Sequence, residues 1–183
     1  MKQNRVSESD GVTEPSCLDE GHKCHLWPLD VEYLIGLRKY AVDKNVRRIS
    51  DVGFNVDLYS DDSREDFILD FHRSHMVLKY TCQCRCRKEI PLLRVDVGYK
   101  YHRNPIRPKK LDSDDPMYDL IEQYAGEEIT GPHIHIYREG YWDTWAFPLD
   151  EDFTDAEDVL KTYEQFMRKC NVVTPPTIRW GPE

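Results

Sequence analysis

Short segments rich in β-branched and aromatic residues run through the middle of the chain, and they predict β-strands. Gly, Asp and Ser residues separate several of these segments where turns are expected. Strands that follow one another directly along the chain favour an antiparallel meander. The predicted strands are residues 53–60, 66–72, 74–87, 89–98, 133–138 and 141–147.

Helical periodicity occurs at three places along the chain. Apolar residues form a rough helical stripe over residues 30–45, and a proline and a following glycine bracket a short helix over residues 116–124. The clearest helix begins at Thr154–Glu157, which matches a capping box, and runs to Cys170. These elements predict an α+β fold, an antiparallel sheet of five to six strands with helices packed on one face.

The domain organisation follows from length and hydropathy. The 183 residues are enough for one domain with a hydrophobic core, and we expect a flexible N-terminal tail over residues 1–20 and a single α+β domain over residues 21–183. No run of about 18 apolar residues is present, so no membrane partner is expected. The N-terminus lacks the apolar region of a secretory signal, which predicts a cytoplasmic location.

Strand parity gathers reactive side chains on one face of the predicted sheet. Successive side chains of a strand point to opposite faces, so Ile134 and Ile136 face the core while His133 and His135 face the other side. When the apolar positions of every strand lie under the helices, the opposite face is polar. It carries Gln83, Arg85, Arg94, Asp96, His133 and His135.

The cysteines divide into two groups. Three share the core face of one strand by the same parity, and free cysteine behaves there as a small apolar residue. Zinc sites usually space their cysteines by two to four residues, so the core is favoured over a metal site for Cys82, Cys84 and Cys86. The second group consists of residue types that bind zinc, but at irregular spacing, and a structural zinc site there stays an alternative. Its members are Cys17, His22, Cys24 and His25.

The charge is unevenly distributed along the chain. The whole protein has a net charge of -9, whereas residues 79–110 carry +8 and the remainder carries -17. A basic band of this kind attracts phosphates or pairs with the acidic remainder of the same fold. The candidate nucleic-acid-binding residues in the band are Lys100, Arg103, Arg107, Lys109 and Lys110.

Four motifs together resemble an uncharacterised family of small bacterial and phage proteins. That family's pattern runs R-x-D, H-x-N-P, G-P-H-x-H-x-Y-R-E-G and W-A-x-P-L before a closing helix. The corresponding segments here are RVD at 94–96, HRNP at 102–105, GPHIHIYREG at 131–140 and WAFPL at 145–149. The chain is also distantly similar to TumE-type toxins of toxin–antitoxin modules, which implies an RNA-directed or antitoxin-bound protein.

The first functional hypothesis is a toxin-like or phage-related ribonuclease that needs no cofactor. Cleavage of RNA requires a base, an acid, and cations where negative charge develops. The two strand histidines can supply base and acid, with a third histidine as the alternative. Two arginines can stabilise the charge, and one carboxylate can fix a histidine tautomer. The candidate catalytic residues are His133, His135, His102, Asp96, Arg94 and Arg85.

Two other functions stay open. His102, His133, His135 and Asp96 form a mononuclear ligand set for zinc or another divalent metal, which would activate water in a hydrolase. Alternatively, the protein is a non-enzymatic acidic inhibitor in phage–host conflict, and its acidic surface binds a basic groove. The partners that these hypotheses imply are RNA, an antitoxin, or a host or defence protein.

Overall fold

The computed structural model describes most of the chain outside the N-terminal segment. The described residues are 28–49, 53–61, 64–74, 78–99, 101–106, 112–138 and 141–181. The predictions for the tail at residues 1–20 and for the second cysteine–histidine group therefore lie outside the described residues. No helix within the described ranges is long and apolar enough to cross a membrane.

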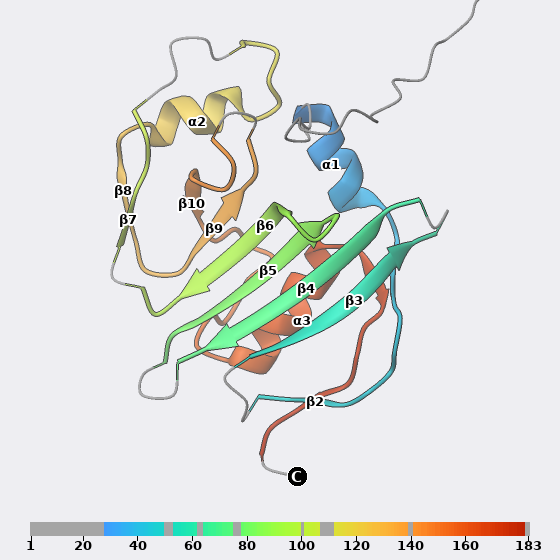
Figure 1. Cartoon of the computed structure of the whole chain (residues 1–183). Helices are drawn as coiled ribbons and strands as arrows, with labels where there is room; N and C mark the ends of the chain where they lie inside the picture. Colours follow the sequence, from blue (N-terminus) through green and yellow to red (C-terminus); the bar gives the residue numbers. More distant parts are fainter. Residues whose placement is uncertain are drawn as a thin grey trace, which may run out of the picture.

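Strands make up most of the structure, and three helices accompany them in the described part of the chain (Figure 1). The elements are α1 (Pro28–Gly36), β1 (Lys39–Ala41), β2 (Arg47–Arg48), β3 (Gly53–Ser60), β4 (Asp66–Arg73), β5 (Tyr80–Cys86), β6 (Ile90–Val97), β7 (Tyr101–Arg103), α2 (Tyr118–Tyr124), β8 (Glu128–Thr130), β9 (His133–Ile136), β10 (Ala146–Pro148), α3 (Val159–Lys169), β11 (Val172–Thr174) and β12 (Ile178–Arg179).

The main sheet has eight strands in the order β10-β9-β6-β5-β4-β3-β1-β11. All neighbouring pairs are antiparallel except β1 and β11, which are parallel. The α+β class is confirmed, but the prediction of five to six strands was too low. The missed strands β1 and β11 have three residues each, too few to show a two-residue period.

The hydrophobic core lies between the sheet and α3, which runs behind β3, β4 and β5 in Figure 1. Tyr163 of α3 packs edge-on against Phe54 and Phe71 of the sheet, at ring-centroid distances of 5.6 and 5.7 Å. Phe166, one turn further along α3, is also buried. Because α3 covers this face, the apolar positions of the central strands point toward it, and their polar positions point away.

The predicted helix over residues 30–45 was wrong in its second half. Helix α1 ends at Gly36, and the chain then enters β1. Lys39 explains the change: its side chain is buried, and its Nζ donates to the carbonyls of Ile35, Leu37 and Cys170 at 2.8–2.9 Å. The ammonium group thereby satisfies carbonyls at the ends of two helices, a role that helical periodicity does not reveal.

The start of α3 also differs from the prediction. The capping box at Thr154–Glu157 does not form; Asp158 is the N-cap instead, and its side chain accepts a hydrogen bond from the backbone N–H of Lys161. Thr154 accepts a hydrogen bond from Gln165 across the turn before the helix. Both residues match the N-cap preference, so the sequence pattern alone does not choose between them.

Strands β5 and β6 form a hairpin whose register shifts by one residue between Cys84 and Arg85, so that Gln83 pairs with Arg94 beyond the shift. Arg87 and Lys88 connect the two strands with φ angles of 51° and 65°, the left-handed conformation of a tight hairpin turn. Cys82, Cys84 and Cys86 consequently lie on the buried face, as predicted. Burial and the nearby carboxylate of Glu65 raise the pKa of the Cys86 thiol to about 12.

Candidate metal centre

Strands β6 and β9 place four polar side chains opposite one another. The antiparallel register pairs Arg94 with His135 and Asp96 with His133. His133 and His135 are 1% and 0% exposed, and Asp96 is 5% exposed. The predicted parity therefore holds, but these side chains are buried rather than spread on a solvated face.

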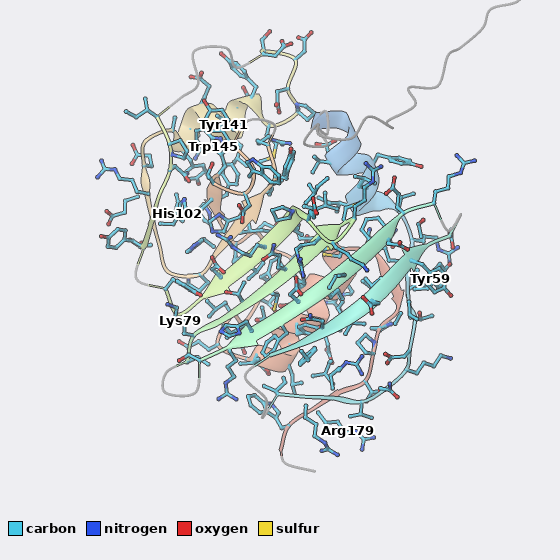
Figure 2. The ribbon with its side chains drawn as sticks, viewed as in Figure 1. Tyr59, Lys79, His102, Tyr141, Trp145 and Arg179 are labelled. Carbon is cyan, nitrogen blue, oxygen red and sulfur yellow. The ribbon has the colours of Figure 1, made fainter. Side chains whose placement is uncertain are left out.

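A third histidine completes the cluster from a different part of the fold. His102 lies on β7, which pairs with β8 outside the main sheet; Figure 2 labels it at the side of the molecule where β9 and β10 lie. Its ring centroid is 4.7 Å from that of His135 and 5.7 Å from that of His133. One ligand nitrogen from each of the three rings can be chosen so that all three lie within 4.8 Å of one another.

Backbone carbonyls orient all three imidazoles. His133 Nδ1 lies 2.8 Å from the carbonyl of Gly131, and His135 Nδ1 lies 2.8 Å from the carbonyl of Asp143. His102 Nε2 lies 2.8 Å from the carbonyl of Thr144. A carbonyl oxygen only accepts, so each of these nitrogens carries the hydrogen. In the neutral form of such a ring the remaining nitrogen has a lone pair; in His135 this nitrogen faces Arg94 and Asp96.

Asp96 adds a carboxylate to the imidazole cluster. Its Oδ2 lies 3.2 Å from His135 Nε2 and 3.8 Å from His133 Nε2. Its Oδ1 accepts a 2.7 Å hydrogen bond from Thr81, whose hydroxyl also lies 3.2 Å from the hydroxyl of Tyr99. Burial alone raises the pKa of Asp96, but the contact with His135, the charge of Arg94 and the hydrogen bond from Thr81 outweigh it and lower that pKa. Asp96 is therefore ionised at neutral pH.

Arg94 lies on the outer side of the cluster. Its Nε donates to Asp96 Oδ2 at 3.1 Å, and one terminal nitrogen lies 3.0 Å from His135 Nε2. Its other terminal nitrogen donates to the carboxylate of Asp143. The Arg94 side chain is 25% exposed, so the cluster is partly open to solvent on this side, as it is at His102.

Burial keeps the two flanking imidazoles neutral. It lowers the pKa of His102, and the neighbouring charges of His133 and Arg94 lower it further, against the hydrogen bond to Thr144. The pKa of His133 is likewise lowered, first by burial and then by His135 and Arg94. Neutral imidazoles with free lone pairs are the form that binds metal ions.

Asn104 holds β7 against the rest of the fold. Its side-chain amide donates to the carbonyls of Ala146 and Tyr124 at 2.7 and 3.1 Å, and its carbonyl accepts from the backbone N–H of Ala146 at 2.8 Å. Ala146 begins β10, next to β9. The amide thus replaces a strand pairing and fixes the position of His102, two residues earlier.

The structure separates the remaining predicted site residues from the cluster. Arg85 pairs with Asp70 through two hydrogen bonds of 2.5 and 2.9 Å, and Gln83 stands between Asp70 and Arg94 in the strand register. Arg103 is exposed on β7. The other four predicted nucleic-acid-binding residues, Lys100, Arg107, Lys109 and Lys110, lie outside the described residues.

Sequence reasoning did not assign a role to several residues that the structure brings to the cluster. Asp143 falls within the predicted strand 141–147, which was wrong at this point: the strand β10 begins only at Ala146, and Asp143 lies in the turn before it. Asn104 belongs to the quoted HRNP motif, and this was the available signal for its role. Thr81 shares the face of Gln83 and Arg85 by the same two-residue period, but its bond to Asp96 depends on cross-strand register.

A family model matches residues 28–172, which contain the three histidines, Asp96 and Arg94. The chain belongs to the family of unknown function DUF6978. Searches of curated proteins and of solved structures found no match. The resemblance to TumE-type toxins stays a prediction, because none of these comparisons bears on it.

Proposed function

We propose that this protein binds a divalent transition-metal ion at His102, His133 and His135, with Asp96 as the carboxylate of the site, and uses it in hydrolysis. The observation that carries the proposal is the shared orientation of the three imidazoles. Each ring gives one N–H to a backbone carbonyl and keeps a lone pair on its other nitrogen. Metal-binding histidines show this arrangement, because the second hydrogen bond fixes the tautomer and the ring plane.

The donor set and its dimensions favour zinc among the divalent ions. Three imidazoles with a carboxylate or a water as the fourth ligand are typical of zinc sites. Two nitrogens bound tetrahedrally to one zinc ion lie about 3.3 Å apart, because the Zn–N distance is about 2.0–2.1 Å. One nitrogen of each ring here lies within 4.8 Å of the others, so zinc binding requires the rings to approach one another by up to about 1.5 Å.

The local charge also favours a cation. Arg94 is the positive group in direct contact with the cluster, whereas Asp96 and Asp143 are two negative ones. With neutral imidazoles these groups sum to -1. Repulsion of a cation by the arginines of this face is therefore small, because Arg85 pairs with Asp70 and two carboxylates neutralise Arg94.

A bound ion would supply a water molecule of lowered pKa, the nucleophile of hydrolytic metal enzymes. Asp96 is ionised, lies beside the same lone pairs and can accept a proton from such a water. A substrate would approach the site where its side chains are partly exposed, at Arg94 and at His102.

The burial of the histidines argues against the metal-free ribonuclease hypothesis. A general base must reach within about 3 Å of the proton that it removes. The rings of His133 and His135 are at most 1% exposed, so a ribose hydroxyl would first have to displace His102 or Arg94. The inhibitor hypothesis, with a host or defence protein as partner, rests on net charge alone, and surface acidity commonly serves solubility.

The direct test is zinc-dependent hydrolysis by the purified protein. We expect one zinc ion per chain, measured by isothermal titration calorimetry after chelator treatment. We also expect cleavage of p-nitrophenyl acetate or bis(p-nitrophenyl) phosphate that is lost with EDTA and restored by zinc. Zinc binding without hydrolysis of either ester would support the metal site but reject the hydrolase function. RNA cleavage that is insensitive to EDTA would favour the ribonuclease hypothesis.

A further inference from the structure

Arg94 makes its contacts with the same atoms that a metal ion would need. One terminal nitrogen lies 3.0 Å from the lone-pair nitrogen of His135, and Nε donates to Asp96 Oδ2 at 3.1 Å. Because Nδ1 of His135 faces the carbonyl of Asp143, Nε2 is the nitrogen left for an ion. A lone pair that accepts a hydrogen bond from a guanidinium cannot bind a cation at the same time.

The contact of Arg94 with Asp143 can persist when its contacts with His135 and Asp96 are lost. Its remaining terminal nitrogen donates to the Asp143 carboxylate. Asp143 and Arg94 are 21% and 25% exposed, whereas Asp96 is buried. The guanidinium can therefore rotate away from His135 and Asp96 toward the open side of the sheet while it keeps its ion pair with Asp143.

We propose that Arg94 is an internal competitor for the cation position and determines the affinity of the site. This inference rests on the proposed metal site. When no ion is bound, the guanidinium group of Arg94 neutralises the charge of Asp96. When an ion binds, this guanidinium group must move away from both His135 and Asp96. The two arrangements are mutually exclusive, so each weakens the other by the same free energy.

The test compares zinc affinity in Arg94→Met, Arg94→Lys and a matched Arg85→Met control. Methionine keeps an extended side chain but removes the charge and the donors, so we expect zinc affinity to rise at least about tenfold in Arg94→Met. Lysine keeps the charge but lacks the planar fork, so a smaller gain is expected. Arg85 pairs with Asp70 on the same sheet face and does not contact the cluster, so Arg85→Met should bind zinc as the wild type does.

A crystal structure of the zinc-loaded wild type provides a second readout that does not require a variant to fold. Arg94 is expected to lie beyond hydrogen-bond distance of His135 Nε2 and to remain paired with Asp143. Equal or weaker zinc binding by Arg94→Met, or an unmoved Arg94 beside bound zinc, would overturn the competition. Absence of one-to-one zinc binding in both the wild type and Arg94→Met would instead reject the proposed metal site itself.

Discussion

Replacing His133 by alanine is expected to weaken zinc binding by about 100-fold or more. The substitution removes one of three imidazole ligands, and even groups that only orient a ligand change metal affinity by about 10–100-fold. His133 is buried, and its Nδ1 is bound to the carbonyl of Gly131, so the ring is held in one orientation. Calorimetric titration with zinc measures the loss.

The matched control is His72→Ala. His72 lies on β4 on the same side of the sheet, exposed and in register with Thr81, so its removal should leave zinc affinity unchanged. Because His133→Ala opens a cavity, the partly exposed ligand His102 is replaced in a second variant, His102→Ala, and circular dichroism verifies folding. Retention of wild-type affinity in folded His133→Ala and His102→Ala would show that zinc binds elsewhere.

Replacing Asn104 by alanine is expected to lower the free energy of unfolding by about 2–4 kcal/mol, the second large effect. The side chain satisfies the N–H and the carbonyl of Ala146 and the carbonyl of Tyr124. Each buried polar group left without a partner costs roughly 1–3 kcal/mol. Urea denaturation monitored by tryptophan fluorescence measures the change.

The same variant also tests how His102 is positioned. Without the amide, β7 loses its bridge to β10, and His102 loses its fixed place beside His135. Zinc affinity should therefore fall by about tenfold in folded Asn104→Ala, within the range known for residues that orient a ligand. If Asn104→Ala is destabilised but binds zinc with wild-type affinity, Asn104 contributes to folding stability only, and its role in positioning His102 is contradicted.

Parity predicted the central part of the site well, because β5 and β6 are long enough for the apolar positions of each strand to mark its core face. The tight turn alone does not give the register, which shifts by one residue between Cys84 and Arg85. Burial of that face was not predictable in the same way. It depends on the β7–β8 pair, whose three-residue strands are too short to show a two-residue period.

The position of His102 also lay beyond sequence reasoning. The chain separates it from His133 by α2 and β8, and long-range contacts hold β7 beside β10: the side chain of Asn104 bonds to Ala146, and His102 itself bonds to the carbonyl of Thr144. The error in α1 has a similar cause. Lys39 is buried because three carbonyls from distant segments converge on its Nζ, and local periodicity carries no information on such contacts.

X-ray absorption at the zinc K-edge, on protein loaded with one equivalent of zinc, tests the central claim most directly. The site predicts nitrogen and oxygen neighbours at about 2.0–2.1 Å, with the multiple-scattering pattern of three imidazoles and no sulfur. A sulfur shell at about 2.3 Å would place the ion on cysteines instead, as expected of a site at Cys17 and Cys24. That result would contradict a metal centre at His102, His133 and His135.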